Sequence, residues 1–183
     1  MAYLRLVHSG PPVPSAESAC LSSFEHELDY IFATLRRLGA APHELEDLAQ
    51  EVFVVLYRNW TTLDTERPLR PYLLGVAFRI VCAHRRRRTR EISYPALDPE
   101  DSAPSPEGSL QSKESTRLLL AALDCVPLIR RAVVVMHDID EVPIVDVART
   151  LSISRFGAYA RLRKGRRELT AAVRRLSKGG VPR

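Results

Sequence analysis

The residues best suited to chemistry form an aromatic and cationic face within the stretch 69–90. Phe78 and Arg79 are adjacent there, and the stretch ends in a basic run from Arg85 to Arg90. Guanidinium groups bind phosphates, and an unstacked base can stack on an aromatic ring. This combination indicates a surface for a nucleic-acid strand. The alternative is a surface helix with a solvated basic end, and the arginine run alone does not separate the two.

Hydrophobic residues recur at helical spacing through the same stretch, which predicts a helix with one buried face. The residues predicted to be buried are Leu69, Tyr72, Leu73, Val76, Ala77, Ile80 and Val81. The opposite face is predicted to hold Gly75, Phe78, Arg79, Cys82 and Arg86. We therefore expect the helix to pack on a core and to present its cationic face to a partner.

A second basic face is predicted near the C-terminus, where the segment from Arg155 onward holds ten Lys or Arg residues and one acid, Glu168. A short helix after Pro143, a turn at 151–153 and a cap at Ser154 precede a long helix, as in a helix-turn-helix. The outward residues of the long helix are Arg155, Phe156, Ala160, Arg161, Arg163, Lys164 and Arg167. An αα-hairpin with a solvated basic face is the alternative. The concentration of charge on the outward face favours the helix-turn-helix.

An acidic stripe is predicted on the helix that begins at Pro42. This helix buries Leu45, Leu48, Ala49, Val52, Phe53 and Leu56, and turns Asp47, Gln50, Glu51, Val54 and Arg58 outward. By spacing alone such a stripe is ordinary surface. It also suits the docking of a basic partner helix.

Enzyme chemistry is weakly supported. The sequence His137-Asp138-Ile139-Asp140-Glu141 contains a His-Asp pair, but a metal site needs ligands from separate elements, and a connecting turn is the simpler interpretation. There is no P-loop, no GxSxG motif and no glycine-rich dinucleotide turn. The three cysteines have no metal-ligand spacing and are expected to be reduced thiols. We expect no catalytic residue, no cofactor and no metal.

The composition places the chain inside the cell. It has 183 residues, 45% of them apolar, and a net charge of +5, which points weakly to a polyanionic partner. No apolar run has the length of a membrane span, and the N-terminus lacks the apolar region of a signal peptide. We therefore expect a cytoplasmic protein; its association with the nucleoid when active is implied only by the family resemblance described below.

The predicted organisation is all-α, with two small helical domains joined by a flexible acidic linker rich in Pro and Ser. We expect a flexible leader at 1–21, a first domain at 22–91 that starts with a capping box at Ser22 and Glu25, and a linker at 92–114. The second domain, capped at Ser115, is expected at 115–177 and contains the helix-turn-helix, and 178–183 form a tail.

The two halves together resemble a bacterial sigma factor of the sigma-70 family, in the extracytoplasmic-function group, from about Phe24 to Leu176. Residues 47–53, Asp-Leu-Ala-Gln-Glu-Val-Phe, are similar to the family's DxxQExF segment. In the family this surface docks on the clamp helices of the largest RNA polymerase subunit. The resemblance implies a core-polymerase site at Asp47, Gln50, Glu51 and Val54.

The stretch 69–87 resembles the family helix that holds the unpaired −10 strand and helps to melt the promoter. Tyr72 stands in place of a tryptophan, and the Phe78-Arg79 pair is inverted in character relative to the usual Arg-Asn. The −10 contacts implied by the resemblance are Arg70, Phe78, Arg79, His84, Arg86 and Arg87.

The second half resembles the domain that reads the −35 element, with Ser152 in place of the usual turn glycine. Gly157 in the first turn of the recognition helix lowers helix propensity by up to about 1 kcal/mol against alanine. The −35 contacts implied by the resemblance are Arg155, Phe156, Tyr159, Ala160, Arg163, Lys164 and Arg167.

The resemblance implies a transcription initiation factor, not an enzyme. Its expected partners are core RNA polymerase (through the clamp helices and the flap of the second-largest subunit), promoter DNA and an anti-sigma factor that can hold it at the membrane. The alternative is a stand-alone helix-turn-helix regulator whose N-terminal half serves for dimerisation or sensing.

Overall fold

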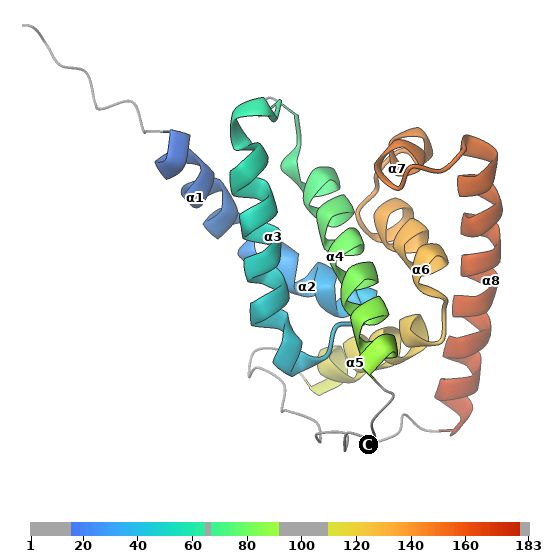
Figure 1. Cartoon of the computed structure of the whole chain (residues 1–183). Helices are drawn as coiled ribbons and strands as arrows, with labels where there is room; N and C mark the ends of the chain where they lie inside the picture. Colours follow the sequence, from blue (N-terminus) through green and yellow to red (C-terminus); the bar gives the residue numbers. More distant parts are fainter. Residues whose placement is uncertain (1–15, 65–66, 92–109, 180–183) are drawn as a thin grey trace, which may run out of the picture.

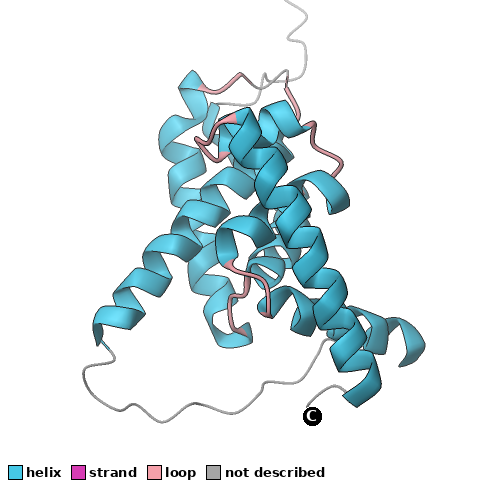
Figure 2. Cartoon of the chain, turned by 90° about the vertical axis from the view of Figure 1, so that its right-hand side faces the viewer, coloured by secondary structure: helices cyan, strands magenta, loops and turns pink. Residues whose placement is uncertain are grey.

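The structure is a computed structural model that describes residues 16–64, 67–91 and 110–179 (Figure 1). These ranges consist of helices joined by short loops and contain no β-strand (Figure 2). The all-α prediction is therefore confirmed. None of the helices described is long and apolar enough to cross a membrane.

The elements fall into two halves. The first half contains α1 (Ala16–His26), α2 (Leu28–Leu38), the 3₁₀ turn η1 (Pro42–Glu44), α3 (Leu45–Asn59), the 3₁₀ turn η2 (Trp60–Thr62) and α4 (Leu69–Glu91). The second half contains α5 (Leu110–Asp124), α6 (Leu128–Val134), the π-helical turn η3 (Val135–Ile139), α7 (Ile144–Thr150) and α8 (Arg155–Gly179).

The first half is a bundle of α2, α3 and α4, with α1 packed on α3. Its core follows the predicted periodicity, with Ile31, Leu35, Leu48, Val52, Leu56, Leu73, Val76, Ala77 and Val81 all buried. Gly39 ends α2 in the left-handed conformation (φ 90°), and its N–H bonds to Arg36 O at 2.9 Å. A glycine is favoured there because it has no Cβ to oppose that backbone.

In the second half α8 packs across α5, α6 and α7. The side of α8 opposite its basic face is buried at Ala158, Leu162 and Ala172. Gly165 lets α8 approach α6 closely, because a Cβ there would lie 2.8 Å from Val134 Cγ2 and 3.2 Å from Arg130 O. The turn before α8 places Ser152 at φ 54°, in the left-handed region that the family's glycine suits.

The first helix begins earlier than the capping box predicted. α1 starts at Ala16, so Ser22 lies inside a helix, and residues 16–21 belong to the fold and not to a leader. The cause is packing against α3, because Cys20 is fully buried. α1 and α2 are separated at Glu27, whose N–H donates to Phe24 O at 3.1 Å in a tighter turn. The rest of the predicted leader, 1–15, lies outside the described residues.

Two further boundaries differ from the prediction. α5 begins at Leu110, before the predicted cap at Ser115, so the predicted linker is shorter at its C-terminal end. α8 continues to Gly179, past the predicted domain end at 177. Residues 92–109 and 180–183 lie outside the described part of the chain.

The two halves pack against each other and share one hydrophobic core. α2 contacts α5 and α6, and α4 contacts α7, so that α4 lies between α3 and the second half (Figure 1). The sequence predicts two helical units but not this contact between them. The contact determines which faces of the functional helices remain accessible.

Candidate nucleic-acid and protein interfaces

The acidic stripe on α3 is exposed as predicted. Asp47, Gln50, Glu51 and Val54 lie at the surface at positions i, i+3, i+4 and i+7, which places them on one helix face. Leu48, Ala49 and Val52 alternate with them and are buried. Val54 is 38% exposed, so the stripe offers an apolar contact beside its two carboxylates and its amide.

Glu44 fixes the start of α3 against the end of α4. One carboxylate oxygen accepts a hydrogen bond from the Ala41 N–H at 2.9 Å, and the other lies 2.9 Å from His84 Nε2 and 2.9 Å from Arg88 Nη1. Burial opposes ionisation, but the hydrogen bonds and the nearby cations prevail and lower the pKa of Glu44. The two helices that carry the predicted polymerase and −10 residues are thus held together by one ionised carboxylate.

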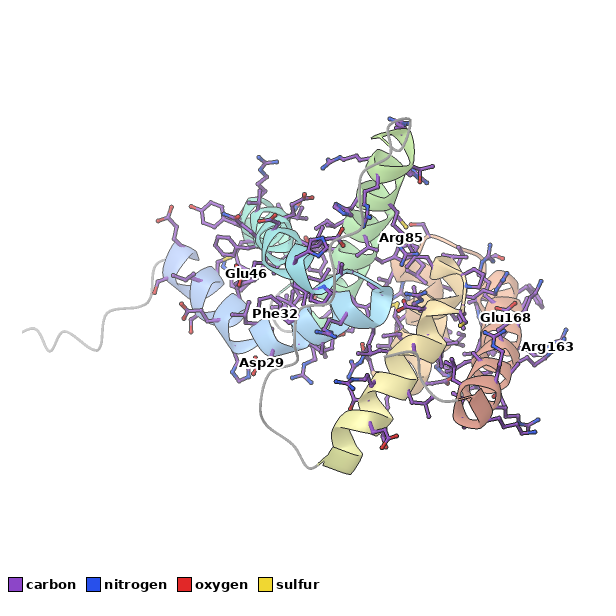
Figure 3. The ribbon with its side chains drawn as sticks, turned by 90° about the horizontal axis from the view of Figure 1, so that it is seen from below. Asp29, Phe32, Glu46, Arg85, Arg163 and Glu168 are labelled. Carbon is purple, nitrogen blue, oxygen red and sulfur yellow. The ribbon has the colours of Figure 1, made fainter. Side chains whose placement is uncertain are left out.

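The predicted −35 residues form one exposed face of α8. Arg155, Phe156, Tyr159, Ala160, Arg163, Lys164 and Arg167 are all exposed. Phe156 is 90% exposed and Tyr159 is 52% exposed. Aromatic side chains are on average more buried than this. Figure 3 shows Arg163 projecting from α8 away from the rest of the molecule.

The start and the orientation of α8 are set by polar contacts outside this face. Ser154 Oγ accepts a hydrogen bond from the Gly157 N–H at 3.0 Å, which confirms the predicted cap. Arg166 forms a two-pronged ion pair with Asp138, its Nε lying 2.9 Å from Asp138 Oδ2. Arg130 Nε donates to Glu168 Oε2 at 2.7 Å. These pairs hold α8 against α6 and η3. Among the residues that the structure describes, Arg155, Arg163, Lys164 and Arg167 form no ion pair.

The predicted −10 residues do not form a single surface. Arg70 and Arg87 are separated by about 25 Å of helix at 1.5 Å per residue. Phe78 is half-buried against the core, whereas Arg79 and Arg86 are exposed.

Ion pairs occupy two of the predicted −10 cations. Arg70 Nε binds Glu27 Oε2 at 2.8 Å, and its guanidinium lies 5.0 Å from the centre of the Tyr30 ring. Arg87 Nη1 lies 3.7 Å from Glu51 Oε1, so a predicted −10 residue touches the predicted polymerase stripe.

A cleft of about 1120 Å³ lies between the halves, beside the N-terminal part of α4. Tyr30, Arg70 and Arg79 line it from the first half, and Asp140 and Arg149 line it from the second. Several of its arginines are paired with acids: Arg70 binds Glu27, and Arg149 Nη1 donates to Asp146 Oδ1 at 2.7 Å. Arg37 and Arg67 likewise pair with Asp140 and Asp64. The predicted outward face of α4 therefore meets the second half at Gly75, whereas Arg79 and Arg86 on the same face are exposed.

Comparison with known proteins identifies the family. Residues 24–91 match the family described as Sigma-70 region 2. The ferric citrate uptake sigma factor FecI of Escherichia coli is 31% identical over 122 residues, which cover 65% of this chain and 69% of FecI. The chain belongs to the extracytoplasmic-function sigma factors.

Two further relatives carry that group name. The extracytoplasmic-function sigma factor SigW of Bacillus subtilis is 26% identical over 81% of this sigma factor and 85% of SigW. SigE of Mycolicibacterium smegmatis is 30% identical over 77% of this chain, which spans only 56% of SigE.

Solved structures show the same fold. The sigma factor RpoE of Bartonella quintana, in complex with the anti-sigma factor NepR, superposes with a TM-score of 0.64 at 17% identity, over 84% of this chain and 98% of that one. CnrH in complex with the cytosolic domain of CnrY gives 0.56 at 18% identity, over 84% and 86% of the two chains.

Sequence reasoning missed the contacts that join the halves of this sigma factor. The segment 137–141 was predicted to be a connecting turn, but Val135–Ile139 form a π-helical turn that places Asp140 in the junction, where Tyr30 OH donates to it at 2.6 Å. Arg131 was not singled out, although only 2% of it is exposed. The only sequence signal for the burial of Arg131 was a charged residue within an apolar run. No sequence signal indicated the position of Asp140.

The ring of His137 contacts the backbone, its Nδ1 lying 2.9 Å from Val142 O. Within the described ranges no group of three or more His, Cys, Asp or Glu side chains is placed to hold a metal ion.

Proposed function

We propose that this sigma factor binds core RNA polymerase through Asp47, Gln50, Glu51 and Val54 on α3 and directs initiation at specific promoters. The observation that carries the proposal is the exposure of this stripe on α3, in the segment that resembles the family's docking motif. The adjacent apolar positions are buried, so the stripe is not needed to hold the fold together. Two carboxylates, an amide and a valine suit the face of a basic partner helix.

The exposed face of α8 is proposed to position the complex at the −35 element. Arg155, Arg163, Lys164 and Arg167 would bind phosphates, which gives affinity that depends strongly on salt. Phe156 and Tyr159 are exposed on this face and would contact base edges in the major groove. The basic side of α8 is exposed, while Arg166 and Glu168 on its other sides form ion pairs with Asp138 and Arg130. This arrangement fits the second helix of a helix-turn-helix.

α4 is proposed to hold the opened −10 strand and to favour melting. Phe78 would stack on an unpaired base, while Arg70, Arg79, Arg86 and Arg87 would bind the backbone. His84 is also one of the proposed −10 contacts, although its Nε2 lies within hydrogen-bond distance of Glu44 Oε1.

Regulation by an anti-sigma factor is proposed by analogy, because the RpoE and CnrH structures are complexes with NepR and CnrY. The protein is proposed to act in the cytoplasm as a binding factor and not as a catalyst.

Run-off transcription tests the proposal. Purified bacterial core polymerase would be incubated with fragments of the protein's own genome, with and without the protein. We expect protein-dependent transcripts that share upstream −35 and −10 elements. Asp47→Arg with Glu51→Arg should abolish these transcripts.

The matched control for this experiment is Glu25→Arg with Asp29→Arg, which reverses two exposed acids of α1 and α2 off the stripe (Asp29 is labelled in Figure 3). The control pair should transcribe normally. Salt-sensitive duplex binding without any transcript would instead indicate a stand-alone helix-turn-helix regulator. Transcription that survives reversal of Asp47 and Glu51 would overturn the docking role.

A further inference from the structure

The exposed face of α8 has a central line and two flanks that differ in chemistry. Phe156, Ala160 and Arg163 lie at positions i, i+4 and i+7, so they follow one line along the helix (Arg163 is labelled in Figure 3). Arg155 and Lys164 lie about 80–100° to either side of Phe156 around the helix axis. All of these side chains are exposed. The line that begins at Phe156 is therefore bordered by a cation on each side.

This arrangement matches the cross-section of the DNA major groove. The groove is about 12 Å wide, and an α-helix with its side chains has a diameter of about 10–12 Å. A recognition helix in the groove directs its N-terminal residues to the base edges, and a phosphate backbone runs along each side. With the central line of α8 on the groove floor, Arg155 and Lys164 would each reach one backbone. Phe156 would then meet the edge of a base.

The side chains available on α8 limit which bases they can read. In the major groove, adenine is read by Asn or Gln, and cytosine by Asp or Glu. Residues 154–167 contain none of these four residue types. Arg163 suits the O6 and N7 acceptors of guanine. Phe156 offers only apolar atoms, and the apolar group that base pairs present in the major groove is the C5-methyl group of thymine.

Phe156 is available for such a contact. Its ring is 90% exposed, and Ala160, the next residue on the line, has no atoms beyond Cβ that could cover it. The first turn that carries the ring is fixed by Ser154, whose Oγ accepts the Gly157 N–H at 3.0 Å. A single exposed hydrophobic residue is common on protein surfaces and does not by itself indicate a contact. Phe156 is distinguished by its place between two phosphate-binding cations at the start of the helix.

We propose that Phe156 reads the C5-methyl group of a thymine in the −35 element. The proposal rests on the proposed function of α8 as the helix that binds this element. The contact would remove the methyl group and part of the ring from water, without a hydrogen bond. Burial of one methyl group corresponds to about a fourfold change in the binding constant. Phe156 thus becomes a specificity-determining residue, whereas Arg155 and Lys164 supply affinity that does not depend on sequence.

The test compares thymine with uracil, which forms the same base pair but lacks the methyl group. The full chain would first select its preferred element from a random-sequence duplex pool. Each thymine of the selected duplex, on both strands, would then be replaced by uracil, one at a time. Fluorescence anisotropy would give the dissociation constants of the thymine and uracil duplexes for the wild type, Phe156→Ala and Phe156→Leu. Arg155→Ala is the control, because it removes a cation from the flank and leaves the ring in place.

We expect the wild type to bind about fourfold more weakly when uracil replaces one particular thymine. Phe156→Ala should bind both duplexes equally, and more weakly than the wild type binds the thymine duplex. Phe156→Leu should still prefer thymine, because leucine keeps an apolar side chain at this position. Arg155→Ala should weaken binding to both duplexes by the same factor, so that the ratio of the two dissociation constants equals that of the wild type.

Two results would overturn the proposal and leave the −35 role of α8 standing. One is a wild type that binds the selected element equally well with uracil at every thymine position. The other is a Phe156→Ala protein that keeps the wild-type preference for thymine. A selection that yields no common element would count against the −35 role itself, and against the proposal with it. Phe156→Ala should fold normally, since its ring is exposed, so these outcomes do not depend on a stability change.

Discussion

His84 on α4 and Glu44 at the start of α3 are joined by a contact of 2.9 Å between Nε2 and Oε1. Arg88 reaches the same oxygen at 2.9 Å, and the other carboxylate oxygen accepts the Ala41 N–H. The Glu44 carboxylate thus contacts both the 3₁₀ turn that precedes α3 and the basic C-terminal end of α4. The helix that presents the acidic stripe is oriented by the helix that presents the arginines.

Glu44→Gln should destabilise the protein by about 1–2 kcal/mol at pH 7, because the amide cannot accept charge-assisted hydrogen bonds from both His84 and Arg88. The pKa of Glu44 is lowered in the folded protein from its ordinary value of 4.5. Its ionised form therefore favours folding fully above pH 4.5, and this contribution is lost as the pH falls through the lower folded value. Urea unfolding at roughly pH 3 to 8, a range that includes the titration of carboxylates, would measure the difference in unfolding free energy between the variant and the wild type.

The control for this series is Glu46→Gln, an exposed acid in the next turn. It should follow the wild type at every pH. A Glu44→Gln deficit that stays constant down to the lowest pH would contradict the role given to the ionised carboxylate.

Gly39→Ala should lower the free energy of unfolding by at least about 1–2 kcal/mol, because alanine is strained in the left-handed conformation. The new methyl group would also meet the guanidinium groups of Arg131 and Arg85 and lie 2.9 Å from Asp124 Oδ1. Thermal unfolding followed by circular dichroism would detect a fall of roughly 2–4 °C per kcal/mol for a chain of this size.

Gly157→Ala is the opposite case and serves as the comparison. Gly157 has an ordinary helical backbone, and a Cβ there would lie 2.7 Å from the flexible end of Arg161 and 3.0 Å from Ser154 Oγ. The substitution should leave stability unchanged or raise it by up to about 1 kcal/mol through helix propensity. Equal losses at Gly39 and Gly157 would show that the conformation of Gly39 is not the cause.

Phe156→Ala should leave stability within about 0.5 kcal/mol of the wild type, because an aromatic ring that is 90% exposed contributes little to the core. Binding to promoter duplex and transcription should fall together. Leu162→Ala, on the buried side of the same helix, should instead cost about 2–5 kcal/mol. A Phe156→Ala protein that binds duplex normally would remove this residue from the proposed −35 contacts.

Arg163→Ala and Lys164→Ala should each reduce the slope of log binding constant against log salt concentration by about one, as expected for the loss of one phosphate contact. Arg166→Ala is the control, because its guanidinium is paired with Asp138 and lies off the basic face. Anisotropy titrations of one duplex at several salt concentrations give the slopes. A slope unchanged in Arg163→Ala but reduced in Arg166→Ala would place the DNA on another face of α8.

Local chemistry made much of this fold predictable. Gly39 ends α2 and Ser154 caps α8 through contacts with residues that are close in sequence. The spacing of Leu48, Val52 and Leu56 indicates which side of α3 is buried. The faces of α3 and α8 were predicted for the same reason: both point to solvent, so periodicity alone determines them.

The burial of Gly75 on α4 could not be predicted in this way, because a distant segment covers it. Gly75 was predicted to lie on an open face, and nothing near it in sequence indicates Thr150 as its neighbour. Asp140 is similarly separated from Tyr30 by 110 positions along the chain. α1 began early for a related reason, since burial of Cys20 against α3 outweighed the capping signal at Ser22.

The contact of 3.7 Å between Arg87 and Glu51 joins two surfaces that are assigned to different partners. A partner that takes up the Glu51 carboxylate releases Arg87, and a phosphate that takes up Arg87 releases Glu51. By thermodynamic reciprocity each event must favour the other by the same factor. The pair is exposed, so the factor is small, but its sign is fixed: polymerase capture and strand capture would be cooperative through a single ion pair.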